Sequence, residues 1–211
     1  MPRGFSLLIF GATGAVGQAV LEQALKRDIG RIIAPTRRPL SLRAARLNNP
    51  VLDLGALTGD EDFWACDAVI CTLGTTIRAA GSQAAFARVD RDLPILVGRF
   101  AKAAGATRYA LNSSLGASPK GNFYLRTKAA AEQGIIDLGF ASTTLVRPSL
   151  IDAERERLRP AEHLGVLLAR ALKPVIPKKY RAVTPRQIAQ ALLHGVLAGE
   201  PGVRVVESDA L

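Results

Sequence analysis

Residues 5–27 of this chain, "FSLLIFGATGAVGQAVLEQALKR", decide its fold. The first six are mostly apolar, a run typical of a buried β-strand. Three glycines follow within residues 11–17, and apolar residues then recur at the spacing of an amphipathic helix. A strand, a glycine-rich turn and a helix in this order predict the first unit of a parallel α/β sheet.

The three glycines stand where a dinucleotide-binding turn needs them. Gly11 permits a sharp turn out of the strand, Gly14 lets a pyrophosphate approach the backbone, and Gly17 lets the helix pack closely on the sheet. The helix N-terminus offers free N–H groups and positive potential to the phosphates. The alternative is a tight turn that binds nothing. The predicted phosphate-binding residues are Gly11, Thr13, Gly14, Ala15, Val16 and Gly17.

The rest of the chain alternates between strand-like and helix-like stretches. We expect further strands at 31–36, 49–54, 67–74, 107–114, 142–148 and 202–208, and further helices at 83–106, 123–139, 161–172 and 186–198. Pro94 is expected to kink its helix or to mark its first turn. This order predicts one α/β domain over residues 1–211, a Rossmann-like doubly wound parallel sheet with helices on both faces. Residues from about 149 to 211 are predicted to form a small helical cap on the substrate side.

Composition narrows the class of protein. The chain has 211 residues, of which 48% are hydrophobic and 22% charged, as in folded proteins. No stretch approaches the ~18 uninterrupted apolar residues of a membrane span, and no cleavable leader is evident. Cys66 and Cys71 are too few for a disulfide framework, and no Cys/His cluster suggests a metal site. We expect a cytoplasmic protein with two buried, reduced thiols and with neither a metal nor a membrane partner.

The net charge of +10 raises the question of a polyanionic partner. The positive residues are dispersed, and the group at 155–159 alternates with acids. Aromatic residues make up 5% of the chain and do not interleave with the basic groups, so no base-stacking surface is indicated. Nucleic acid is therefore not the favoured partner, and polyanion binding ranks third among the functions considered.

The end of the second predicted strand bears on the choice of dinucleotide. NAD-selective sites place an Asp or Glu there to hold the ribose hydroxyls. This chain has no acid between Ala34 and Leu40, and has Arg37 and Arg38 instead. Guanidinium groups suit a 2′-phosphate, so NADP(H) is favoured over NAD(H). The alternative is that one or both arginines lie on a surface turn without a ligand.

A second motif, "NSSLGASPKGNFYLRTK" at 112–128, carries groups for proton transfer. Tyr124 and Lys128 are four residues apart and lie on one face of a predicted helix. A free tyrosine is a poor acid-base group at neutral pH, and a neighbouring ammonium stabilises its phenolate. The preceding strand ends at Ser113 and Ser114, either of which could hydrogen-bond a substrate carbonyl.

Five stretches together resemble a known family: "GATGAVG" (11–17), "CTLGTT" (71–76), "SSLGA" (113–117), "YLRTK" (124–128) and "VRPSLI" (146–151). The chain is similar to the short-chain dehydrogenases/reductases, specifically to their atypical branch of Tat-interactive-protein-like NAD(P)H-binding proteins. The resemblance covers essentially the full length. It implies that Tyr124 donates or accepts the proton, that Lys128 also binds the nicotinamide ribose, and that Ser113, or alternatively Ser114, orients the reacting oxygen. The further cofactor contacts it implies are Asp53 and Leu54 at the adenine, Leu73, Gly74 and Thr75 along the dinucleotide, and Pro148 and Ser149 at the nicotinamide.

One position departs from the family pattern. The fourth member of the family's catalytic set is usually an asparagine in the long central helix, where this chain has Asp90. Two functions therefore stay open. The first is an NADP(H)-dependent oxidoreductase acting on a carbonyl or alcohol of a small molecule, with residues 152–181 shaping its pocket. The second is a non-catalytic NADP(H)-binding regulatory or redox-sensing protein. The long Ala-rich helices also offer faces for a homodimer.

Overall fold

The computed structural model describes residues 4–152 and 177–211. In these residues, seven parallel strands form one sheet in the order β3-β2-β1-β4-β5-β6-β7. The strands are β1 (Ser6–Phe10), β2 (Arg31–Ile33), β3 (Leu47–Asn48), β4 (Ala68–Cys71), β5 (Arg108–Asn112), β6 (Ser142–Arg147) and β7 (Gly202–Glu207). The order confirms the predicted Rossmann-like, doubly wound sheet, which changes winding direction between β1 and β4.

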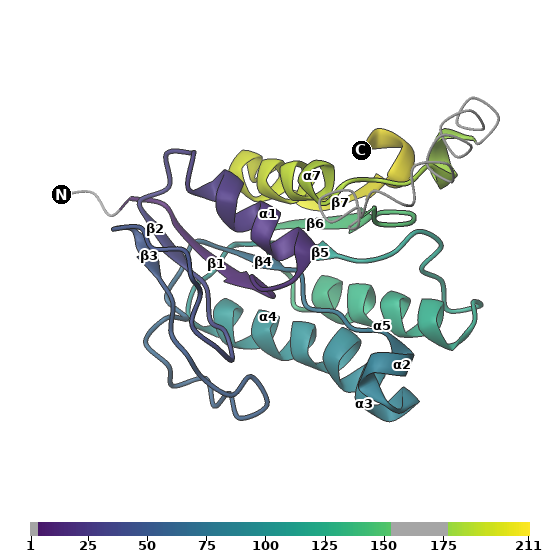
Figure 1. Ribbon diagram of the computed structural model, residues 1–211, viewed down its shortest axis with the longest axis horizontal. Helices are drawn as coiled ribbons and strands as arrows, with labels where there is room; N and C mark the ends of the chain where they lie inside the picture. The colour runs from purple at the N-terminus through teal and green to yellow at the C-terminus, as the bar shows by residue number, and fades with distance from the viewer. Residues whose placement is uncertain (1–3, 153–176) are drawn as a thin grey trace, which may run out of the picture.

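Two layers of helices cover the two faces of the sheet (Figure 1). Helices α1 (Ala15–Ala24) and α7 (Pro185–Ala198) lie on one face, and α4 (Leu93–Ala103) and α5 (Phe123–Asp137) lie on the other. The core follows the alternation of β1. Leu7 and Ile9 pack into the cluster on the α1/α7 face, whereas Leu8 and Phe10 pack into the cluster on the α4/α5 face. Because both faces are covered, β1 is buried along its whole length, and its four residues after Ser6 are all apolar.

The predicted long helix at 83–106 is interrupted. It consists of α3 (Gln83–Ala87), a wider π-helical turn η1 (Arg88–Asp92) and then α4. Pro94 is the second residue of α4. Proline has no backbone N–H to donate, and the first turn of a helix tolerates it for that reason. The π turn carries Asp90, which is 2% exposed, toward the interior. Turns of this kind often occur at functional positions of helices. The remaining short helix, α2 (Ile77–Ala80), precedes α3.

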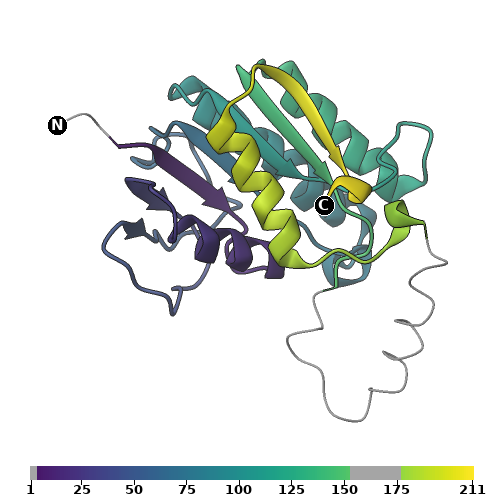
Figure 2. The same cartoon turned by 90° about the horizontal axis from the view of Figure 1, so that it is seen from above.

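Residues 185–207 correct the predicted cap, because they belong to the layers of the main fold. Helix α7 packs against α1, and β7 pairs with β6 along six residues, as Figure 2 shows from above. The apolar side chains of Ile188, Leu192 and Val196 recur at helical spacing and are buried on that face of the sheet. Such a stripe needs a sheet face to cover it, which a small cap would not provide. The predicted helix at 161–172 lies outside the described residues.

The third strand also differs from its prediction at 49–54, since β3 covers Leu47–Asn48. Pro50 lacks the N–H that a regular ladder needs. The pairing nevertheless continues past it, because Thr36 N donates to Pro50 O at 3.0 Å and Leu52 N donates to Thr36 O at 3.0 Å. In the part of the chain that the structure describes, no helix has the length and apolar character needed to cross a membrane.

Candidate functional site

The loops that follow β1, β4 and β5 lie side by side at one edge of the sheet. Phe10 pairs with Cys71, and Cys71 pairs with Leu111. Since all three strands are parallel, the segments directly after these residues leave the sheet at the same edge. The glycine loop (residues 11–17), the turn 72–76 and the two serines are therefore neighbours.

Gly11 and Gly17 are required by the packing of the protein itself. Gly11 has a φ of 87°, and a Cβ there would lie 2.6 Å from Thr72 Oγ1 and 2.8 Å from Leu73 N. A Cβ on Gly17 would lie 2.0 Å from Gly11 O. The backbone of the loop is thus in close contact with the end of β4 on one side and with the first turn of α1 on the other.

Gly14 is different, because the protein leaves room for a side chain at this position. A Cβ there would meet Gly11 O at 3.5 Å, an ordinary contact, and the φ of −80° suits any residue. Gly14 is the N-cap of α1, with no side-chain cap and no acid in the first turn. Uncapped N–H groups at a helix N-terminus suit an anion, so the backbone beside Gly14 is a suitable place for a phosphate group to approach.

The two arginines follow β2 on an ordered turn. Thr36 Oγ1 donates to Arg38 O at 2.6 Å, and Asn49 Nδ2 donates to Thr36 Oγ1 at 2.8 Å. The side chains of Arg37 and Arg38 are exposed. The backbone is therefore held while both guanidinium groups extend into solvent.

The predicted adenine contacts occupy different surroundings. Asp53 is exposed and uses Oδ1 to accept a hydrogen bond from Gly55 N at 2.8 Å. Leu54 is half-buried and packs against the aromatic core cluster that includes Trp64. Of the two, Asp53 is the one with its side chain at the surface.

Helix α5 brings Tyr124 and Lys128 together. Asn122 caps the helix by accepting from Leu125 N at 3.0 Å. Tyr124 is half-buried, with its ring 5.5 Å from that of Phe86, and Lys128 is buried one turn further on. Lys128 Nζ lies 5.9 Å from the centre of the Tyr124 ring. The lysine charge is thus held beside the tyrosine, as the sequence spacing predicts.

Asp90 adds a buried carboxylate beside Lys128, so that Asp90, Lys128 and Tyr124 form one cluster. Its Oδ1 forms an ion pair with Lys128 Nζ at 2.7 Å, outside the geometry of an aligned hydrogen bond, and its Oδ2 accepts from Thr75 N at 2.9 Å. The two charged side chains are only 1% and 8% exposed. Asp90 therefore offsets the charge of Lys128 and ties the turn 72–76 to the π turn and to α5. The sequence marked Asp90 as unusual but did not show that it contacts Lys128.

The strand alternation separates the two candidate serines. Tyr109 and Leu111 of β5 belong to the core cluster on the α4/α5 face, so Ser113 turns toward that face and Ser114 away from it. Ser113 is 4% exposed, and its Oγ has no hydrogen-bond partner within residues 4–152 and 177–211. Ser114 Oγ makes a long hydrogen bond to Leu115 O at 3.4 Å. Ser113 is therefore the serine on the side of Tyr124 and Lys128.

Cys71 at the end of β4 is unsuited to redox chemistry. Burial raises the pKa of its thiol to about 11, although the backbone of Leu73, the hydroxyl of Tyr109 and the charge of Lys128 act against that shift. Tyr109 donates its own hydroxyl to Pro94 O at 2.9 Å. The thiol is thus a packed, protonated group, in agreement with the prediction for Cys71.

A network that the sequence analysis missed holds the end of β6. Arg147 donates from Nε and Nη2 to the two carboxylate oxygens of Glu132, at 2.9 and 2.5 Å, and from Nη1 to Glu207 at 3.0 Å. These hydrogen bonds raise the pKa of Arg147. Glu132 is buried on α5, one turn after Lys128. Arg147 therefore fixes α5 against β6 and β7, next to Pro148 and Ser149 at the same edge of the sheet.

Pro148 and Ser149 are themselves held by hydrogen bonds of both backbone and side-chain groups. Leu115 N donates to Pro148 O at 2.8 Å, and Ser149 N donates to Ser208 Oγ at 3.1 Å. Ser149 Oγ donates to Arg181 O. The predicted nicotinamide end thus rests on three separate segments of the chain.

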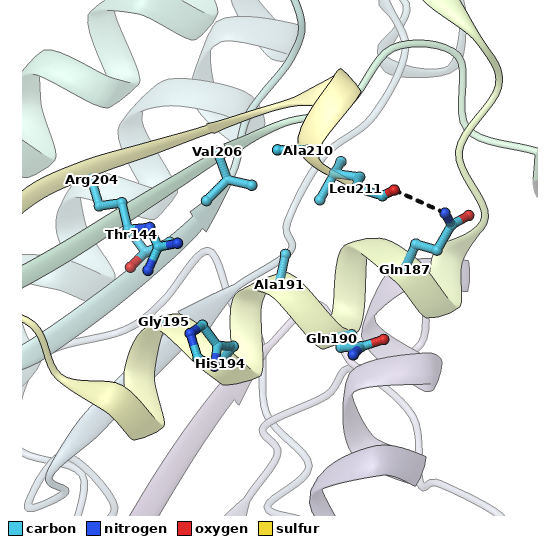
Figure 3. A pocket seen from close by; sticks show the side chains of 10 residues that line it. All are labelled: Thr144, Gln187, Gln190, Ala191, His194, Gly195, Arg204, Val206, Ala210 and Leu211. Atoms are coloured by element: carbon cyan, nitrogen blue, oxygen red, sulfur yellow. Dashed lines mark hydrogen bonds between the residues drawn. The ribbon is translucent and has the colours of Figure 1, made fainter. Parts of the chain in front are cut away.

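A cavity of about 340 Å³ lies elsewhere, between α7 and β7 (Figure 3). It is lined by Thr144, Gln187, Gln190, Ala191, His194, Gly195, Arg204, Val206, Ala210 and Leu211. Gln187 Nε2 donates across its rim to Leu211 O at 3.0 Å, and the exposed Arg204 pairs with Glu200. None of the predicted site residues borders it. Within the described ranges, no three His, Cys, Asp or Glu side chains gather to hold a metal ion.

Comparison with known proteins identifies the family of this chain. The family model described as NAD(P)H-binding matches residues 11–174. Protein HTATIP2 of Rattus norvegicus is 31% identical over 215 residues, which cover 98% of this chain and 87% of that protein. The protein described as fmp52, mitochondrial, of Emericella nidulans is 35% identical over 183 residues, which cover 81% of this chain and 77% of its own.

Solved structures share the fold. MoeE5 in complex with UDP-glucose and NAD superposes with a TM-score of 0.72 at 17% identity, over 95% of this chain and 74% of that chain. A short chain dehydrogenase family protein from Francisella tularensis superposes with a TM-score of 0.67 at 16% identity, over 98% of both chains. The family model and the two relatives show that this chain belongs to the NAD(P)H-binding proteins of the atypical short-chain dehydrogenase/reductase family.

Proposed function

We propose that this protein is an NADP(H)-dependent oxidoreductase that acts on a carbonyl or alcohol group of a small molecule. One observation carries the proposal: the buried Lys128 ammonium lies 5.9 Å from the Tyr124 ring centre, at the sheet edge where the glycine loop leaves space for a phosphate. A family of NAD(P)H-binding proteins and a structural neighbour described with NAD bound support the cofactor class.

The side chains divide the chemistry among them. A bound nicotinamide supplies or takes up a hydride at C4. Tyr124 gives its proton to the substrate oxygen during reduction and takes it back during oxidation. Ser113 Oγ, which has no partner among the residues that the structure describes, is available to donate a hydrogen bond to the same oxygen. Lys128 stabilises the phenolate that Tyr124 becomes and can donate to the ribose hydroxyls.

The preference for NADP(H) rests on Arg37 and Arg38. Their side chains are exposed on a turn fixed by Thr36 and Asn49, at the end of the strand next to β1. Replacing both by alanine is expected to weaken NADPH binding at least tenfold and to leave NADH binding nearly unchanged, because only NADPH carries a 2′-phosphate. Replacing the exposed Arg99 of α4 by alanine is the matched control. Equal losses for both cofactors would show that these arginines do not select the phosphate.

A second function is favoured by Asp90. Its carboxylate offsets the charge of Lys128 at 2.7 Å and so weakens the stabilisation of a phenolate at Tyr124. A protein with this arrangement could bind NADP(H) without turnover and report cofactor occupancy to a partner. Binding without turnover would favour this regulator.

The test combines binding and turnover in matched variants. Wild type, Tyr124→Phe and Tyr180→Phe are titrated with NADPH and NADH by fluorescence and then assayed on a panel of aldehydes and ketones. Tyr180 is 62% exposed and serves as the control for losing a tyrosine hydroxyl. We expect all three to bind NADPH within about threefold, and Tyr124→Phe alone to lose turnover by a factor of roughly 10²–10⁴. Full turnover in Tyr124→Phe would remove Tyr124 from the mechanism.

Two further predictions concern the cellular location and the oligomeric state of the protein. A cytoplasmic location and a homodimer stay predictions from the sequence. The Emericella nidulans relative is described as mitochondrial, so fractionation with markers of both compartments is the direct check on location. Light scattering of the purified chain is the check on the dimer.

A further inference from the structure

Asn112 is the last residue of β5, and the oxygen of its side-chain amide is buried. Its Oδ1 has no hydrogen-bond partner in the part of the chain that the structure describes. A buried acceptor without a donor is destabilising, and native proteins keep few of them. The sequence analysis assigned no role to Asn112.

The strand register places Asn112 on the same face of the sheet as the glycine loop. Phe10, Cys71 and Leu111 form one row across β1, β4 and β5, and their side chains pack toward α4 and α5. The next row contains Gly11, Thr72 and Asn112, and it faces α1 and α7. Val146, which pairs with Asn112, confirms this by packing in the core cluster on that face.

The spacing of this row suits the far end of a dinucleotide. Asn112 lies two strands from Gly11, a lateral separation of about 10 Å at the usual strand spacing. Thr72 lies between them, and its hydroxyl group contacts the position of Gly11. A dinucleotide with its pyrophosphate at the N-terminus of α1 would extend along this row toward β5, and its far end would lie between Asn112 on this face and Lys128 on the other.

We propose that Asn112 is a positioning residue that accepts a hydrogen bond from the amide NH₂ of the nicotinamide carboxamide. The proposal rests on the dinucleotide binding proposed above. A carboxamide NH₂ is the donor that Asn112 Oδ1 lacks. Asn112 and Ser113 then divide the work by face, since adjacent strand residues point to opposite sides. Asn112 serves the cofactor, and Ser113 serves the substrate oxygen.

The decisive experiment removes the proposed donor by changing the cofactor and the proposed acceptor by mutating Asn112. Wild type and Asn112→Leu are each titrated with the oxidised dinucleotide that the wild type binds more tightly, and with its 3-acetylpyridine analogue, in which a methyl group replaces the NH₂. Wild type is expected to prefer the carboxamide form by about 5- to 10-fold, the usual effect of one hydrogen bond, and Asn112→Leu is expected to bind both forms equally. Asn112→Ala gives the same comparison with a smaller side chain.

A thermal measurement without any ligand provides an independent readout. Asn112→Leu should raise the Tm of the unliganded protein, because it removes a buried amide oxygen that has no hydrogen-bond partner among the described residues. Asn49→Leu is the matched control and should lower the Tm, because the Asn49 amide accepts from Leu40 N and donates to Ala34 O and Thr36 Oγ1.

The outcomes separate the two proposals. If wild type binds no dinucleotide, the proposed function fails and this role for Asn112 fails with it. If wild type binds, but both Asn112 variants keep the preference for the carboxamide form, only the role of Asn112 is overturned.

Discussion

The glycine loop (residues 11–17) and the lysine cluster (Asp90, Tyr124 and Lys128) lie at the same edge of the sheet but are built differently. The loop is held by backbone contacts within one continuous stretch, where Gly11 and Gly17 have no room for a side chain. The cluster is held by a buried ion pair between two helical segments that are distant in sequence. The comparison teaches that binding of the phosphates depends on local backbone shape, whereas control of the proton depends on a long-range balance of charge.

The largest expected effect comes from breaking the buried ion pair. Lys128→Met leaves the Asp90 carboxylate buried and uncompensated, so the free energy of unfolding should fall by about 3–5 kcal/mol. Denaturant unfolding at neutral pH measures it. The double variant Lys128→Met/Asp90→Asn should recover most of the loss, because asparagine carries no charge and keeps an acceptor for Thr75 N. If the double variant is as unstable as the single one, charge balance is not what holds the cluster.

The second prediction contrasts two glycines of the loop. Gly17→Ala should lower the free energy of unfolding by about 3 kcal/mol or more, because its Cβ would lie 2.0 Å from Gly11 O. Gly14→Ala should change stability by less than about 1 kcal/mol and weaken NADPH binding about tenfold, because the added methyl group occupies the space of the phosphate. Unfolding curves and fluorescence titrations measure the two effects. Undiminished NADPH binding by Gly14→Ala would mean that the pyrophosphate does not rest at this position.

The smallest expected effect concerns Cys71 in β4, the strand that lies between β1 and β5. Burial raises the pKa of Cys71 from the ordinary 9.0 to about 11, so the folded state keeps the thiol proton that the unfolded state loses. The resulting stabilisation is complete below pH 9 and is lost as the pH rises through 11. The free energy of unfolding should therefore fall by about 2–3 kcal/mol between pH 9 and pH 11. The decline should be shallower in Cys71→Ala, and identical slopes for the two proteins would count against this origin.

The prediction of the fold succeeded where the determinants are local. The strand, loop and helix of residues 5–27 are specified by neighbours in sequence, and the same holds for Tyr124 and Lys128, which are one helical turn apart. It misplaced the third strand, because the regular ladder of β3 covers Leu47–Asn48 and only an isolated pairing continues past Pro50. The helix at 186–198 and the strand at 202–208 were predicted correctly as α7 and β7, but they were assigned to a cap, because their apolar residues could have covered either a cap or the sheet.

The sequence by itself determined the class of fold, the glycine loop and the candidate proton-transfer pair, because each depends on spacing within about one strand-loop-helix unit. Only the tertiary structure decided that Asp90 pairs with Lys128, that Ser113 turns toward α5, and that the Asn112 oxygen finds no hydrogen-bond partner among residues 4–152 and 177–211. The physical reason is that charge pairing and hydrogen-bond satisfaction depend on which distant segments the sheet brings together. Residue type and local spacing do not show which individual residues will make those contacts.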